Sequence, residues 1–375
     1  MGPEDVSSGA LCFQGTSGLT HTMLCNMIRT IREQIKEGIC RSAFHSKVEE
    51  WYRSHRSEGI RILTYHSFGN DAKRDLFMKL PIAMFARQLD FLSTNYRVVP
   101  LSLAADLITG RTTDKDYDPR PIAVITIDDG FEECYSLAFP ELSKRSLPAT
   151  IFVATDFVDT GRLPWPTEIS GILSALQYFR PITGTQVELK SLWNKDSIRR
   201  RELNILSRLT PSERMLALQK LRRINLDDTD SGNRPCALSW AQIEEMAKEG
   251  IEIGSHTAFH SILPYMPREI IQQELRESKH RIEKMLNRPC QFFAYPNGTW
   301  NLLVAQEVEA AGYEAAVSQD WGLNDHIGSL YALNRIEIPY YESLEVFACR
   351  VSGLARPVKE LFSKDGTSSP AQVAR

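Results

Sequence analysis

Two acidic residues and two histidines, far apart along the chain, are the residues best suited to chemistry. Asp128 and Asp129 end the apolar run that begins at Pro121, and His256 and His260 directly follow a second apolar run, 250–254. One Asp and two His form a common ligand set for a divalent metal that keeps an open coordination position. A second carboxylate that is not a ligand is free to act as a base. This combination predicts metal-assisted hydrolysis.

Each pair requires a particular local backbone. Neighbouring side chains on a strand point to opposite faces, so Asp128 and Asp129 can act at one site only if the strand breaks there, and the glycine that follows them supplies the break. Two imidazoles four residues apart on one turn can face the same point. The zinc-protease pattern HExxH has this spacing, but Thr257 stands where that motif needs Glu. The metalloprotease class is therefore excluded.

The surrounding sequence predicts the elements that hold these residues. Apolar runs alternate with amphipathic stretches, which indicates an α/β fold with parallel strands. The predicted strands are 60–66, 122–127, 149–154, 251–254, 291–295, 315–318 and 334–339. The predicted helices are 83–95, 137–145, 240–249, 267–286 and 302–311. Seven strands of this kind indicate a closed or nearly closed (β/α) barrel, with its chemistry at the strand ends.

The chain divides into a long central domain and two flanking segments. Residues 1–57 are expected to form an extension that is partly disordered and then helical, residues 58–345 the domain, and 346–375 a C-terminal tail. Within the domain, about 157–235 is charged and helical in pattern, without a core strand, and interrupts the alternation. Because this insertion follows a strand end, it is expected near the site, either as a lid or groove wall or as a plain decoration.

Composition excludes several classes of protein. The net charge of −3, from 44 basic and 47 acidic residues, gives no general attraction to nucleic acid or to an anionic membrane. Seven scattered cysteines include no CxxC pair and fit a reducing compartment better than a disulfide framework. No secretory signal is visible and no apolar run is long enough to span a bilayer, so a cytoplasmic protein without a transmembrane segment is expected.

Four segments, taken together, resemble the motifs of polysaccharide deacetylases, the group with the NodB homology domain or carbohydrate esterase family 4. The segment 126–130 (TIDDG) resembles the first motif, TFDDG, and 256–260 (HTAFH) resembles the second, H[ST]xxH. The segment 293–298 (FAYPNG) is similar to the third motif in its FAYPxG form, and 63–66 (LTYH) to the YH that opens the domain in that subgroup. Order and spacing agree over roughly 60–340.

The resemblance implies a distorted (β/α)7 barrel and a metal-dependent hydrolase that removes N-acetyl groups from a polysaccharide or its saccharide precursor. By position, Asp129, His256 and His260 would bind the metal, with zinc expected, and Asp128 would be the general base. The substrate would be an N-acetylated carbohydrate. Two alternatives are a deacylase or deformylase of a lipid-linked or small sugar, and an inactive carbohydrate-binding protein on the same fold. The oligomeric state is not indicated.

The chain departs from the usual family pattern at two points. The third motif normally supplies an Arg that orients the catalytic carboxylate, but this chain has Ala294 there, and Arg335 is the candidate replacement. The fifth motif, LxH, which carries the general acid, is missing, and His66 is the candidate substitute.

Further residues are expected to bind substrate. Tyr295, Pro296 and Asn297 belong to the third motif, and a backbone N–H near Asn297 would form an oxyanion hole. Three aromatic residues could each stack on a sugar ring or pack in the core: Tyr295, Trp321 after a predicted strand, and Trp165 at the start of the insertion.

Overall fold

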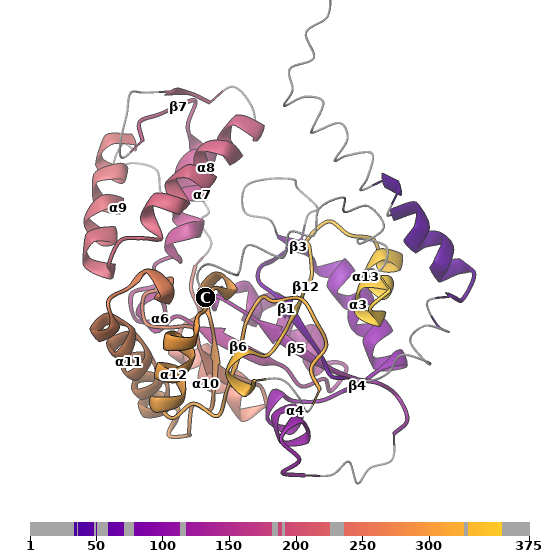
Figure 1. Cartoon of the computed structure of the whole chain (residues 1–375). Helices are drawn as coiled ribbons and strands as arrows, with labels where there is room; N and C mark the ends of the chain where they lie inside the picture. The colour runs from indigo at the N-terminus through magenta and orange to yellow at the C-terminus, as the bar shows by residue number, and fades with distance from the viewer. Residues whose placement is uncertain are drawn as a thin grey trace, which may run out of the picture.

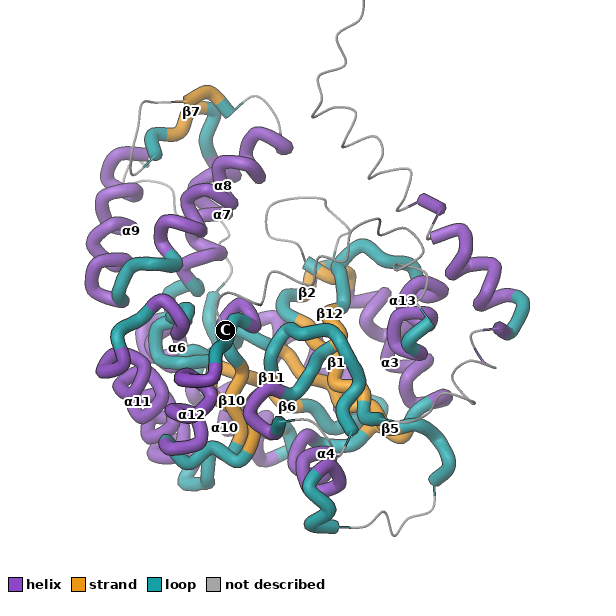
Figure 2. Tube along the Cα trace, in the orientation of Figure 1, coloured by secondary structure: helices purple, strands orange, loops and turns teal. Residues whose placement is uncertain are grey.

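A curled parallel sheet forms the centre of the computed structural model (Figures 1 and 2). The structure describes residues 34–35, 37–48, 50, 59–70, 79–112, 118–181, 187–189, 192–225, 236–325 and 329–354. The strand order is β11-β10-β9-β6-β5-β1-β12, with β4 also pairing with β5. The strands are β1 (Arg61–Tyr65), β4 (Arg97–Val98), β5 (Ile122–Ile127), β6 (Thr150–Val153), β9 (Glu252–Ser255), β10 (Phe292–Ala294), β11 (Ala315–Val317) and β12 (Ile336–Glu337).

The two edges of this sheet meet. The segment that leads into β12 forms a parallel bridge between Leu333 and Val317 of β11, and Ile336 of β12 then pairs with Leu63 of β1. The segment before β12 therefore links the β11 edge to the β12 edge and closes the sheet into an irregular barrel, which leaves little unpaired edge. All seven predicted strands are present, and the predicted distorted (β/α)7 barrel is confirmed.

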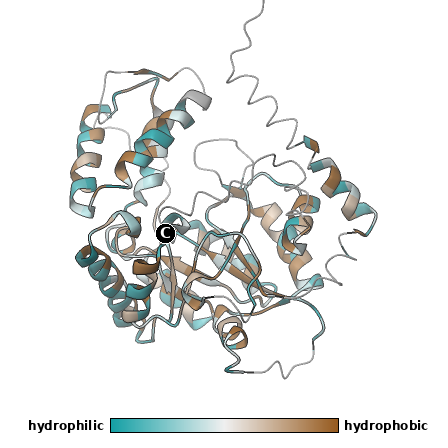
Figure 3. Cartoon of the chain, in the orientation of Figure 1, coloured by the Kyte–Doolittle hydropathy of each residue, from teal (hydrophilic) through white to brown (hydrophobic). Residues whose placement is uncertain are grey.

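Helices surround the barrel and bury their apolar faces against it (Figures 2 and 3). They are α3 (Ile82–Asn95), α4 (Leu101–Ile108), α5 (Phe139–Ser143), α6 (Thr155–Thr160), α10 (Trp240–Lys248), α11 (Arg268–Leu286), α12 (Leu302–Ala310) and α13 (Leu344–Ser352). Ser239 and Gln242 form the capping box that begins α10. In the described part of the chain, no helix is both long enough and apolar enough to cross a bilayer.

A helix spans residue 346, where the sequence predicts the start of the tail. α13 buries Phe347, Cys349 and Val351 and packs against α3. The helical residues 37–45 pack on the outer side of α13, where Cys349 Sγ donates a hydrogen bond to the carbonyl oxygen of Cys40. The part of the N-terminal extension that the structure describes thus lies against the domain.

The insertion has a small hydrophobic core of its own. It contains α7 (Trp165–Ala175), a short hairpin of β7 (Tyr178–Phe179) and β8 (Val187–Glu188), α8 (Leu192–Leu206) and α9 (Pro211–Asn225), drawn in rose at the upper left of Figure 1. Its apolar cluster includes Ile169, Leu218 and Leu221 and extends to Ile262, just after the second histidine motif. The insertion is therefore packed onto the loop that carries His260.

Candidate metal centre and active site

Three side chains from two strand ends converge on one point. Asp129 follows β5, and His256 and His260 follow β9, which is separated from β5 in the sheet by β6 alone. Asp129 Oδ1 lies 3.5 Å from His256 Nε2 and 3.2 Å from His260 Nε2. One ligand atom from each residue lies within 4.8 Å of the other two, so these residues form a candidate metal site.

The spacing of these atoms fits a tetrahedral metal. Zinc bonds to His nitrogen and carboxylate oxygen are about 2.0–2.2 Å long, and tetrahedral geometry then separates two ligand atoms by about 3.4 Å. The two measured separations, 3.2 and 3.5 Å, lie on either side of that value. A carboxylate and two imidazoles are also the donors that such an ion prefers.

A second contact orients His256. Its Nδ1 lies 2.7 Å from the carbonyl oxygen of Ala294 and donates a hydrogen bond to it, so Nε2 is the ring nitrogen that faces Asp129. Outer contacts of this kind fix the tautomer of a metal-binding histidine. Ala294 stands where polysaccharide deacetylases usually have Arg. At this position the backbone carbonyl oxygen, rather than a side chain, contacts a residue of the candidate site.

Unusual backbone conformations gather around these residues. Seven described residues other than glycine have positive φ, and four of them are Asp129 (75°), Thr257 (66°), His260 (51°) and Asn297 (56°). Such conformations are disfavoured for L-residues and persist where the surrounding structure imposes them. Gly130 (68°) continues the turn after Asp129. The strand break expected after the two Asp residues is present, and it directs Asp129 toward the histidines.

The neighbouring Asp128 pairs with Arg335. Arg335 Nη1 donates to Asp128 Oδ1 at 2.8 Å and Nη2 donates to Oδ2 at 2.7 Å, a bidentate pair that is almost completely buried. The guanidinium also donates from Nε to Ser318 O (2.7 Å) and from Nη1 to Thr126 Oγ1 (3.2 Å). Arg335 thus reaches Asp128 from the segment before β12, although the family's usual Arg lies in the third motif.

The pKa shifts follow from burial and charge. Burial alone would raise the pKa of Asp128, but the positive charge and hydrogen bonds of Arg335 hold it below the usual value. The pKa of Asp129 is well below its ordinary value, because the hydrogen bonds to His256 and His260 outweigh burial. Burial lowers the pKa of His260, which favours the neutral imidazole that metal binding requires. For His256 burial acts in the same direction, but the two Asp residues outweigh it and raise the pKa.

Groups outside the ligand set hold the loop that carries His260. From α11, the buried carboxylate of Glu274 accepts hydrogen bonds from the N–H groups of Ala258 (2.8 Å) and Phe259 (3.0 Å) and from the hydroxyl of Ser261. Burial raises the pKa of this carboxyl, while the same donors stabilise its charged form.

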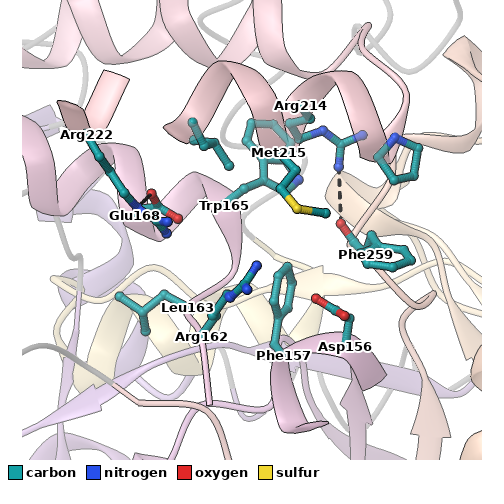
Figure 4. Close-up of a pocket in the computed structure, with 12 residues that line it drawn as sticks. Asp156, Phe157, Arg162, Leu163, Trp165, Glu168, Arg214, Met215, Arg222 and Phe259 are labelled. Carbon is teal, nitrogen blue, oxygen red and sulfur yellow. Dashed lines mark hydrogen bonds and ion pairs between the residues drawn. The ribbon is translucent and has the colours of Figure 1, made fainter. Parts of the chain in front are cut away.

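The insertion holds the same loop from the other side (Figure 4). Arg214 of α9 donates from Nη1 to the carbonyl oxygen of Phe259 at 3.1 Å and lies 3.5 Å from that of His260. Trp165 of α7 donates from Nε1 to His260 O at 2.9 Å, and the Arg214 guanidinium lies over its ring at 4.9 Å. Trp165 is only 4% exposed, so it packs in the core and supports His260, and its ring is not available to stack on a sugar.

The candidate site opens into one cavity of about 490 Å³. Barrel residues on its wall include His66, both Asp residues, both His residues and Asn297, and α7 and α8 of the insertion supply Pro166, Thr167, Ser170, Arg199 and Leu203. The insertion therefore forms one wall of the cavity that contains the candidate metal site.

Of the other predicted site residues, His66 and Asn297 line the cavity. His66 follows β1 and lines the same cavity wall as Asp128 and Asp129. Asn297 also lines the cavity and is exposed, whereas Pro296 is buried.

Tyr295 and Trp321 do not line this cavity in the described part of the chain. Tyr295 is buried, its hydroxyl donates to Tyr331 O at 2.7 Å and its backbone N–H donates to Val317 O. Both polar groups of Tyr295 thus have partners within the protein, and its ring packs in the core. Trp321 is partly exposed outside the cavity, beside Asp320, whose carbonyl oxygen accepts the N–H of Arg335.

Several residues on the cavity wall were not predicted from the sequence, among them two tyrosines and an arginine. Tyr340 and Tyr341 lie in the loop after β12, with their rings 5.0 Å apart at 84°, and Tyr341 is 62% exposed. Their place after a strand end was the available signal. The place of Arg199 on the cavity wall could not be predicted. The sequence shows only a run of basic residues on a helix and does not show in which direction each side chain points.

The comparison that decides the family is with sequence models of known families. The model described as "Polysaccharide deacetylase" matches residues 115–316, more than half of the chain. The chain belongs to the polysaccharide deacetylase family. It is accordingly a hydrolase of the class that acts on carbon–nitrogen bonds other than peptide bonds.

Individual relatives agree with this assignment. The chain is 22% identical over 290 residues to "Putative polysaccharide deacetylase YxkH" of Bacillus subtilis (strain 168), covering 77% of this chain and 74% of the relative. Among solved structures, the Streptococcus pyogenes deacetylase PplD in complex with acetate is similar in fold, with a TM-score of 0.53 at 19% identity over 78% of this chain and 98% of that one. The structure of IcaB from Ammonifex degensii is also similar in fold, with a TM-score of 0.52 at 18% identity over 80% of this chain and 97% of that one.

Proposed function

We propose that this polysaccharide deacetylase is a metal-dependent enzyme that hydrolyses the N-acetyl amide of a sugar, in a polysaccharide or its saccharide precursor. One observation carries the proposal. Asp129, His256 and His260 each offer one ligand atom within 4.8 Å of the others, beside a second carboxylate, Asp128, that is held by Arg335. A protein that only bound carbohydrate would have no need of this arrangement.

The ion we expect is zinc, held by Asp129, His256 and His260. When bound there, zinc supplies Lewis acidity, which lowers the pKa of water toward about 7 and polarises the acyl carbonyl. Asp128 is the general base. Its lowered pKa keeps it ionised at neutral pH, and the two hydrogen bonds from Arg335 fix the carboxylate so that it can accept the proton of the attacking water.

Two further groups complete the proposed chemistry. A backbone N–H near Asn297, on the cavity wall, stabilises the negative charge that develops on the acyl oxygen. His66 is the general acid and donates a proton to the leaving nitrogen. An amine leaves poorly unless it is protonated, so this step contributes about 10² to 10⁴ in rate.

The test is acid release from a panel of acylated saccharides. Purified protein is stripped with a chelator, reloaded with zinc, and incubated with N-acetylated and N-formylated oligosaccharides, with metal content measured on the same samples. We expect acetate release that is lost on stripping and restored by about one zinc per chain. Formate release without acetate would support the deformylase alternative, and stoichiometric metal without any acid release would remove the proposal.

A further inference from the structure

The wall contributed by the insertion places a positive charge in the active-site cavity. Arg199 of α8 lines the same cavity as Asp129, His256 and His260. Leu203, one helical turn later, lines it too, so this face of α8 is turned toward the cavity. The side chain of Arg199 is 15% exposed and is thus largely withdrawn from bulk solvent.

The guanidinium of Arg199 is held in place by the neighbouring helix. Its Nε donates to Ser170 Oγ of α7 at 2.7 Å, and that hydroxyl in turn donates to Pro166 O at 3.1 Å. Ser170 fixes the plane of the group through one donor. Apart from the ion pair with Asp196, the described residues offer no further partner to the remaining donors, on Nη1 and Nη2.

The charge of Arg199 is only weakly balanced. Asp196 lies 3.8 Å from its Nη1, but the same carboxylate is 2.6 Å from Nη2 of Arg200 and is engaged mainly there. Of the carboxylates on the cavity wall, Asp128 is paired with Arg335 and Asp129 belongs to the candidate metal set. Glu337 is exposed, and among the described residues it forms no ion pair with Arg199 within 4.0 Å.

We propose that Arg199 binds an anionic group, a carboxylate or a phosphate, on the saccharide whose acyl group reaches Asp129, His256 and His260. The proposal rests on the proposed deacetylase function and names the class of its substrate. A fixed planar guanidinium with free donors suits bidentate binding of either anion. Tyr340 and Tyr341 line the same cavity and supply aromatic faces suited to a sugar ring.

The experiment compares three N-acetylated substrates at equal zinc loading. They are a neutral chitotetraose, a hyaluronan tetrasaccharide with a carboxylate on alternate sugars, and N-acetylglucosamine 1-phosphate. We expect wild type to show the highest kcat/KM on one of the anionic substrates. Arg199→Gln should lower kcat/KM on that substrate about 10- to 100-fold, the range for a hydrogen-bonded charged group, and leave the neutral substrate unchanged. Whether the carboxylate or the phosphate substrate responds identifies the anion.

Two control variants distinguish the loss of the Arg199 charge from a general loss of folding. Arg223→Gln removes an exposed positive charge from α9 of the same insertion, outside the cavity, and should change none of the three rates. Arg199→Lys, which keeps the charge, should retain part of the preference even if Arg199→Gln does not fold. With wild type alone, added NaCl should lower kcat/KM on the anionic substrate only.

Two results would overturn the inference while leaving the proposed function intact. One is a wild-type preference for the neutral substrate, and the other is an equal loss on all substrates in an Arg199→Gln variant that is folded and binds zinc as wild type does. Absence of acetate release from every substrate by zinc-loaded wild type would instead remove the proposed function, together with the inference that rests on it.

Discussion

Arg335 and Asp128, 207 residues apart in the chain, form a buried bidentate pair with hydrogen bonds of 2.8 and 2.7 Å. The pair orients the carboxylate beside the candidate metal ligands and keeps it ionised. In this chain the orienting Arg precedes the last strand, and the third-motif position holds Ala294, whose carbonyl oxygen faces His256. Four features can be tested separately: the proposed base Asp128, its pair with Arg335, the proposed acid His66, and the loop that carries His260.

The base is tested by Asp128→Asn. This variant keeps the shape of the side chain but cannot accept a proton, so kcat for deacetylation should fall by about 10² to 10⁴. Zinc content should remain at the wild-type level, because Asp128 is not among the three ligands. Acetate release measured with metal analysis checks both statements, and near wild-type turnover with zinc bound would remove Asp128 from its role.

The Arg335–Asp128 pair should also make stability depend on pH. The pKa of Asp128 is lowered in the folded protein, so the pair stabilises fully above the ordinary carboxyl pKa of about 3.9 and loses this contribution as pH falls through the lower folded value. Asp128→Asn leaves the Arg335 charge unbalanced and should lower the free energy of unfolding by about 3–5 kcal/mol at neutral pH. Urea unfolding in the presence of chelator should show this difference shrinking below about pH 4. A difference that grows as pH falls below about 4 would contradict the assigned direction.

The general acid is tested by changing the leaving group. His66→Gln should lower kcat/KM on an N-acetyl sugar by about 10² to 10⁴, because the leaving amine needs a proton. On 4-nitrophenyl acetate the loss should be small, since 4-nitrophenolate leaves without one. His280→Gln, at an exposed position of α11, is the matched control and should affect neither substrate. Equal losses on amide and ester would assign His66 to another role.

The insertion should influence metal affinity through the loop of His260. Arg214→Gln and Trp165→Phe each remove donors to backbone carbonyls at Phe259 or His260, and groups that orient metal ligands typically change affinity about 10- to 100-fold. Competition with a chromophoric chelator should show weaker zinc binding in both variants and no change in Arg223→Gln. If Arg214→Gln lowers the free energy of unfolding but leaves zinc affinity unchanged, Arg214 contributes to packing and does not orient the loop of His260.

The sequence alone determined the fold class and the metal-binding candidates. Apolar runs between amphipathic helices predicted seven parallel strands, because burial on both faces leaves a pattern that local sequence records. Asp128, Asp129, His256 and His260 could be named for a similar reason: they directly follow such runs, and parallel strands bring their carboxyl ends to one side of the barrel.

Contacts between distant segments were decided only by the tertiary structure. Arg335 was one candidate for the missing Arg, and only the closing of the sheet by β12 brings it to Asp128. Tyr295 was expected at the substrate, yet its ring lies in the core, because a motif records which residues occur together without recording where each side chain points. The placement of Arg199 on the cavity wall and of Arg214 behind His260 depends on how the insertion packs on the barrel. That packing arises from many contacts between residues far apart in the chain, and no local pattern encodes it.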